Sequence, residues 1–131
     1  MIVLLNSTGR LSRFNGDVSG WNTSLLARPE GMFHRNPIFN RDLSNWQTSR
    51  FTRTVNMFYG DSAFASDLSG WDMSSVTAAD WMFFGCGSFV SDLYTWDTHN
   101  LISAAFMFRN ARKFNSDISL WNTSSVYIYS I

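Results

Sequence analysis

The stretch FASDLSGWDMSSVT at residues 64–77 decides the fold, because its Phe, Asp and Trp recur every 25 residues along the chain. One Trp, one Phe and one Asp keep this 25-residue spacing in every unit. The Trp ladder is Trp21, Trp46, Trp71, Trp96 and Trp121; the Phe ladder is Phe14, Phe39, Phe64, Phe89 and Phe114; the Asp ladder is Asp17, Asp42, Asp67, Asp92 and Asp117. A fixed period without insertions means that every unit follows the same backbone path, which identifies a tandem-repeat protein.

The first half of each unit predicts a short strand. Leu68, Trp71 and Met73 have the L-x-x-L-x-L spacing of leucine-rich repeats, with Trp in the middle place. Trp71 and Met73 are two residues apart, so both should face inward, while Asp72 and Ser74 face outward. We therefore expect parallel strand pairing between neighbouring units, with the Trp and Phe ladders in the core.

The second half of each unit predicts a helix of about two turns. Met82, Cys86 and Phe89 stand at i, i+4 and i+7, the spacing of one helix face. Gly60 and Gly85 lie where this helix should end, because Gly tolerates the left-handed conformation of a helix stop. The predicted fold class is α/β: a right-handed, leucine-rich-repeat-like solenoid with short parallel strands on one face and short helices on the other.

The repeat predicts a single domain over residues 1–131. Its complete units are 21–45, 46–70, 71–95 and 96–120, with partial units at 1–20 and 121–131. Polar capping units, which close the ends of most repeat arrays, are not evident in the sequence. We therefore expect a fragment of a longer array that stacks on further repeats, or ends that a partner covers.

Three elements of the repeat closely resemble the repeat of BspA-like leucine-rich-repeat surface proteins, of the mycoplasma and listeria type. They are Phe-x-x-Asp-Leu at 64–68, Trp-Asp at 71–72 and Met-Phe at 82–83. The resemblance covers residues 11–126. It implies a cell-surface or secreted protein that takes part in adhesion or protein binding, and it brings no catalytic motif. The sequence itself shows no signal peptide or anchoring segment.

Composition narrows the classes of partner. Basic and acidic residues number ten each, so there is no electrostatic reason to expect nucleic acid or an anionic membrane. No apolar run approaches the roughly 20 residues of a membrane-spanning helix, so this segment should not insert into a membrane. Acidic groups concentrate in residues 56–100, which hold six of them and no basic group. The single cysteine, Cys86, excludes an intrachain disulfide.

The Asp ladder has two interpretations. A row of carboxylates could hold hard cations such as calcium, which take several oxygen ligands. Alternatively, each Asp accepts backbone N–H hydrogen bonds at a turn, a common use of this residue. Calcium-binding repeats carry more acidic ligands per turn than this one, so the hydrogen-bonding interpretation is favoured and no metal site is expected.

The best candidate binding surface is the outward face of the predicted strands. Residues shortly after each ladder Trp should point to solvent there. The candidate residues are Gln47, Arg50, Asp72, Tyr94, Asp97, His99 and Asn100. A basic partner would dock at Asp72 and Asp97, although an ordinary solvated face has the same polar composition.

Nothing in the sequence predicts an enzyme or a cofactor. His34 and His99 lie at different offsets of the repeat, and no Ser-His-Asp order, paired-His helix or Gly-rich phosphate loop is present. Trp81 stands outside the Trp ladder, and the sequence leaves it open as peripheral core or as an exposed interaction aromatic. The predicted function is a non-enzymatic repeat scaffold that binds a protein or a glycan. The alternatives are a purely structural spacer and a cation-binding Asp ladder.

Overall fold

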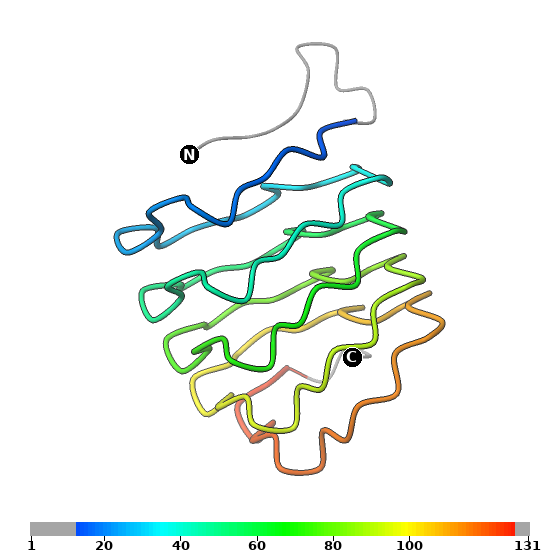
Figure 1. Cartoon of the computed structure of the whole chain (residues 1–131). Helices are drawn as coiled ribbons and strands as arrows, with labels where there is room; N and C mark the ends of the chain where they lie inside the picture. The colour runs from blue at the N-terminus through cyan, green and yellow to red at the C-terminus, as the bar shows by residue number, and fades with distance from the viewer. Residues whose placement is uncertain (1–12, 128–131) are drawn as a thin grey trace.

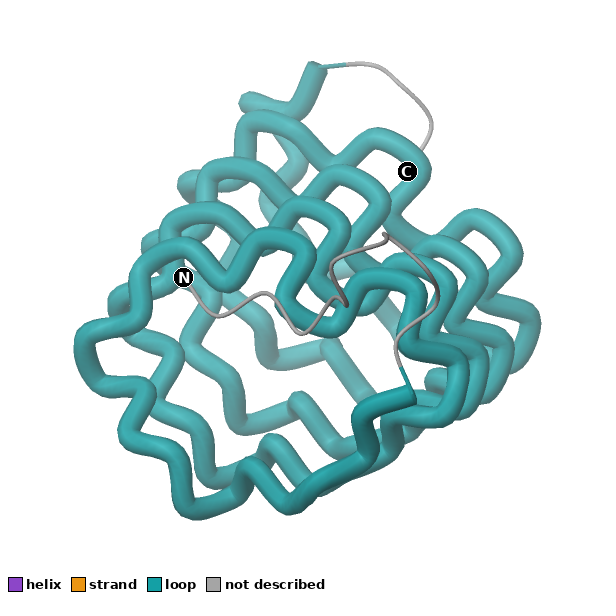
Figure 2. Tube along the Cα trace, turned by 90° about the horizontal axis from the view of Figure 1, so that it is seen from above, coloured by secondary structure: helices purple, strands orange, loops and turns teal. Residues whose placement is uncertain are grey.

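Each 25-residue unit forms one layer of a stack in the computed structural model, which describes residues 13–127. Figure 1 shows the layers following one another from the blue N-terminal end to the red C-terminal end. Figure 2 shows from above that the layers largely superpose. Backbone hydrogen bonds join one layer to the next, as from the Phe58 N–H to the Met82 carbonyl at 3.0 Å. The repeat of the sequence is therefore a repeat of backbone conformation.

The predicted α/β fold of strands and helices is wrong. Between residues 13 and 127 the backbone contains no helix and no extended strand, only turns and connecting segments. Two isolated parallel bridges, Arg53 with Ala78 and Ala78 with Ser103, are the nearest approach to a sheet in that part of the chain. The layers are stacked tight turns, drawn as loop throughout in Figure 2.

The predicted strand is absent because two turns interrupt it within one unit. The Trp71 N–H donates to the Leu68 carbonyl at 3.0 Å, and the Val76 N–H donates to the Met73 carbonyl at 3.0 Å. Both bonds span three residues and close β-turns. The Ser-Gly pair at 69–70 is a turn signal in the sequence that outweighs the apolar spacing around it.

The leucine-rich-repeat spacing holds in only one layer, that of Leu68, Trp71 and Met73. Met73 is buried, but its equivalents in the other layers are Thr23, Thr48, Thr98 and Thr123. The buried Thr48 hydroxyl accepts the Asp72 N–H of the next layer at 2.8 Å. Most layers thus carry a buried hydroxyl that bonds the backbone, where the leucine-rich pattern requires an aliphatic side chain.

The predicted helix is absent because two residues in each layer adopt a positive φ. In one layer they are Trp81 at 53° and Gly85 at 73°. The Trp81 N–H donates to the Ala105 carbonyl of the next layer at 2.9 Å, whereas the Met82 N–H donates three residues back to Ala79 at 3.2 Å. Residues in the left-handed region cannot continue the i to i−4 ladder of an α-helix. The chain therefore forms successive tight turns between residues 80 and 85.

The Trp ladder lies in the core, where each indole is fixed by the layer before it. Four members are buried: Trp46, Trp71, Trp96 and Trp121. Trp21 is half-buried. The Trp71 indole N–H donates to the Leu43 carbonyl at 3.0 Å, and the other three buried indoles bond the preceding layer in the same way. A buried indole N–H needs an acceptor, so this bond fixes the stacking register.

Two columns of Phe fill much of the remaining core. Neighbouring rings of the Phe ladder lie 5.8–6.3 Å apart between centroids. The second column, from the Met-Phe pairs, is Phe33, Phe58, Phe83 and Phe108, with 5.6 Å between neighbouring centroids. The columns also touch within a layer, as at Phe58 and Phe64, 4.0 Å apart. Met82, Cys86 and Phe89 are buried as their spacing predicted, although no helix carries them.

Candidate functional site

All seven residues of the predicted binding face are exposed, but they do not form one surface of a sheet. The structure brings three of them together. His99 Nδ1 lies 2.6 Å from the Asp97 carboxylate, and the Asn100 amide lies 3.0 Å from His99 Nε2. In residues 13–127, no side-chain hydrogen bond or ion pair joins this cluster to Gln47, Arg50 or Tyr94.

Asp72 and Asp97 each close a turn. The Asp72 carboxylate accepts the Ser74 N–H at 2.9 Å, and that of Asp97 accepts the His99 N–H at 3.1 Å. At the equivalent place the Asn22 side chain makes the same bond at 3.1 Å. The turn requires the side-chain oxygen and not the charge, so the turn does not account for the negative charge at these two positions.

The Asp ladder is a second column of such turns. Each carboxylate accepts the N–H two residues on, at 2.8–3.0 Å: Asp17 from Ser19, Asp42 from Ser44, Asp67 from Ser69, Asp92 from Tyr94 and Asp117 from Ser119. This is the arrangement that the hydrogen-bonding interpretation describes. Hydrogen bonds from the following serine lower the pKa of Asp17, Asp42, Asp67 and Asp117. Across the described layers, no three His, Cys, Asp or Glu side chains converge to hold a metal ion.

Tyr94 lies in a surface hollow of about 390 Å³ between two layers, which we call the Tyr94 hollow. Its lining combines an aromatic ring, an aliphatic side chain, two carboxylates, one amine and one amide. These are Tyr94, Val90, Asp92, Asp117, Lys113 and Asn115. Val90 and Tyr94 are 57% and 42% exposed. The sequence singled out Tyr94 and the two ladder Asp residues, but not Val90, Lys113 or Asn115, because only the stacking brings them side by side.

A second surface feature, the aromatic ledge, consists of Trp81, Phe106 and Arg109. Trp81 is 37% exposed, which answers the question that the sequence left open. Its ring stacks on Phe106 with 6.2 Å between centroids, and the Arg109 guanidinium lies 5.4 Å from the Phe106 centroid. Trp81 and Phe106 have φ values of 53° and 54°. Bulky residues rarely adopt this left-handed conformation, so the ledge is held at an energetic cost.

One acidic group is buried. Asp61 is fully buried, and neither carboxylate oxygen has a hydrogen-bond partner. Burial raises the pKa of Asp61 to about 9. Burial also raises the pKa of the Cys86 thiol. Cys86 is itself buried, and its Sγ donates to the Phe58 carbonyl at 3.0 Å, so the thiol has a packing role.

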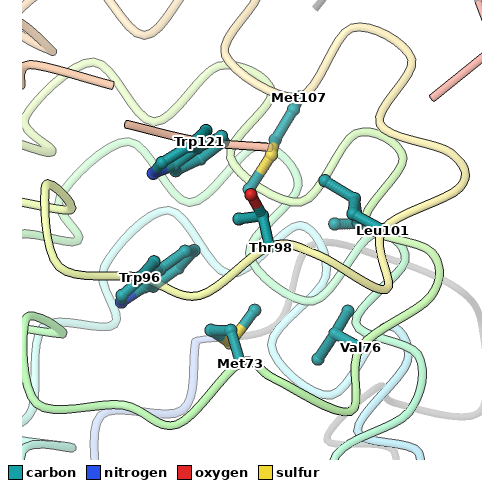
Figure 3. Close-up of a pocket in the computed structure, with 8 residues that line it drawn as sticks. Met73, Val76, Trp96, Thr98, Leu101, Met107 and Trp121 are labelled. Carbon is teal, nitrogen blue, oxygen red and sulfur yellow. The ribbon is translucent and has the colours of Figure 1, made fainter. Parts of the chain in front are cut away.

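A small cavity lies inside the stack and is shown in Figure 3. It encloses about 10 Å³, and Met73, Val76, Leu101 and the Trp96 and Trp121 rings line it. A water molecule needs at least this volume together with several polar partners. The walls are mostly apolar, so we assign this space to imperfect packing beside Met73.

Comparison with protein families gave two overlapping matches to one family model, at residues 8–83 and 46–130. The family is described as "Mycoplasma protein of unknown function, DUF285". The chain belongs to this family. The DUF285 match supports a mycoplasma-type repeat and does not extend to the finer BspA-like leucine-rich-repeat assignment.

Comparisons of this DUF285 chain with curated proteins and with solved structures gave no match. Within residues 13–127, no helix is long and apolar enough to cross a membrane. The family membership thus fixes the repeat, and its description leaves the function open.

Proposed function

We propose that this DUF285 chain is a non-enzymatic scaffold that binds a protein or glycan partner, as part of a cell-surface or secreted protein. The observation that carries the proposal is the aromatic ledge. Trp81 and Phe106 occupy a left-handed position that is Gly31 and Asn56 in the two preceding layers. Gly and Asn suit that conformation, whereas a bulky side chain there costs on the order of 1–3 kcal/mol.

A purely structural spacer gains nothing from the bulky side chains that cause this backbone strain. The stack can form the layer with Asn56 as well as with Trp81, since both N–H groups bond the next layer at 2.9–3.0 Å. The Trp81 side chain adds only one aromatic contact, with Phe106, among the described residues. A partly exposed Trp that stacks on a Phe, with an Arg on the same Phe ring, has the composition of a binding hot spot, in which Trp and Arg are enriched. Binding therefore explains the ledge better than spacing does.

The test is a binding screen of the whole chain on arrayed glycans and arrayed purified proteins. Saturable binding by the wild-type chain should be weakened at least tenfold by Trp81→Asn. The unfolding free energy should stay the same or rise by about 1 kcal/mol, because relief of strain offsets the lost stacking.

The matched control is Ile102→Thr. Ile102 is 42% exposed, and Thr52 and Thr77 hold the equivalent position. This variant also removes exposed apolar area but should leave binding unchanged. The absence of saturable binding to either array, or equal binding by Trp81→Asn, would favour the spacer.

The seven residues of the predicted face remain a second candidate surface of the same scaffold. Their turns do not need the charges of Asp72 and Asp97, so these carboxylates are available to a basic partner. The aromatic ledge is the stronger candidate, because the backbone strain at Trp81 and Phe106 is explained if these side chains bind a partner.

A further inference from the structure

We propose that the Tyr94 hollow binds a neutral sugar ring. The inference lies within the glycan branch of the proposed function but concerns a different surface from the aromatic ledge. It starts from two substitutions in the repeat. Tyr94 stands where the other layers have Ser19, Ser44, Ser69 and Ser119. Only the backbone N–H of this position is needed for the turn, so the stack does not require the tyrosine ring.

Val90 belongs to a column that starts with Asn15 and Asn40, continues with Ala65 and ends with Asn115. The Asn15 side chain accepts the Asn40 N–H at 3.1 Å, and Asn40 accepts the Ala65 N–H at 3.0 Å. Val90 cannot make such a bond, yet its side chain is 57% exposed and gains little from packing. An aliphatic and an aromatic side chain are thus left uncovered in one layer, where most equivalent positions of the repeat carry Asn or Ser.

The polar groups of the hollow retain free hydrogen-bonding capacity. Asp92 uses one oxygen, Oδ1, for the Tyr94 N–H and the Ser116 hydroxyl, and Asp117 uses Oδ1 for the Ser119 N–H. Among the described residues, the second oxygen of each carboxylate and the Lys113 ammonium make no hydrogen bond or ion pair. The lining therefore offers two acceptors and a charged donor, together with the Asn115 amide, which is both donor and acceptor.

This mixture selects the ligand class. A cation would be attracted by Asp92 and Asp117 but would meet Lys113, and an anion would meet the two carboxylates. A neutral pyranose has hydroxyls that both donate and accept, and one face of C–H groups that can lie against Tyr94 and Val90. The volume of about 390 Å³ falls within the range of small-molecule sites.

The test is titration of the isotope-labelled whole chain, followed by NMR, with three probes. They are methyl glucopyranoside as the neutral ring, glucosamine as its cationic form and glucuronate as its anionic form. We expect saturable shifts for the neutral ring, largest at the backbone amides of Val90, Tyr94 and Asn115. Tyr94→Ser should weaken this binding at least tenfold, and Tyr94→Phe should retain most of it because the ring face is kept.

The site is excluded if the neutral ring causes no saturable shift, or if the Tyr94→Ser variant binds it equally well. Saturation by glucosamine alone would mean a cation site made by the carboxylates, and saturation by glucuronate alone would mean an anion site at Lys113; either result overturns the proposal. Trp81→Asn should leave the sugar titration unchanged. The experiments therefore distinguish a failure of sugar binding at the Tyr94 hollow from a failure of partner binding at the aromatic ledge.

Discussion

Asp61 is a carboxyl group in a place that suits an amide. Its counterpart one layer earlier, Asn36, is equally buried, and its Nδ2 donates to the Phe14 carbonyl at 2.6 Å. An ionised Asp61 would leave a charge in the core without a partner. With its pKa raised from 3.8 to about 9, the group stays protonated in the folded chain at neutral pH and ionises in the unfolded chain.

Replacing Asp61 with Asn should therefore stabilise the protein, and the gain should depend on pH. The contribution of a raised pKa is fully present below 3.8 and is lost progressively as pH rises, with the loss complete near 9. At pH 7 the Asp61→Asn variant should gain up to about 4 kcal/mol in unfolding free energy. Urea unfolding at pH 4, 7 and 9 measures the trend.

Asp67→Asn is the matched control with the opposite sign. The hydrogen bonds from Ser69 lower the pKa of Asp67, so its contribution is present above 3.8 and is lost as pH falls through the folded value. This variant should therefore lose some stability at neutral pH and match the wild-type chain in acid. A gain for Asp61→Asn that stayed constant from pH 4 to 9 would contradict a protonated Asp61.

At the scale of the turn, the double change Asp72→Asn with Asp97→Asn should leave the fold intact. Asn22 and Asn122 already close the equivalent turns, accepting the N–H two residues on at 3.1 and 3.0 Å. The melting temperature should therefore shift by no more than a few degrees. Any binding of a basic partner at this face should weaken and lose its dependence on salt. Unchanged binding and salt dependence would move the basic partner's site elsewhere.

These turns also mark how far the sequence could predict the structure. The period, the ladders and the inward direction of Trp71 or Phe89 follow from spacing, because each position meets the same environment in every layer. The predicted strand is wrong because the turn-forming residues Asp67, Ser69 and Gly70 override the hydrophobic spacing around them. The left-handed conformation of Trp81 is not expected from the residue itself, and its one signal in the sequence is the Gly31 and Asn56 at the equivalent position of the preceding layers.

At the scale of the whole molecule, stability comes from contacts between neighbouring layers. Repeat stacks are approximately sums of single-layer terms and interface terms, so the position of a lesion in the stack determines its effect. Figure 1 shows the green layers, near residues 60–80, in the middle of the stack, with others on both sides. Trp21 belongs to the first described layers and is half-buried, whereas Trp71 is 3% exposed. The indole of Trp71 should therefore contribute more to the free energy of unfolding than the indole of Trp21.

Trp71→Ala should cost about 3–5 kcal/mol, because it opens a core cavity and leaves the Leu43 carbonyl without its indole donor. Trp21→Ala should cost less, since a partly exposed ring loses less buried area. Hydrogen exchange measures how far each lesion spreads. For Trp71→Ala, amides that bond between layers, such as those of Thr54 and Phe83, should lose protection on both sides of the change. For Trp21→Ala, the loss should stay near the N-terminal layers and leave Phe83 protected. Loss of Phe83 protection in Trp21→Ala would mean that the stack unfolds as a single unit and not layer by layer.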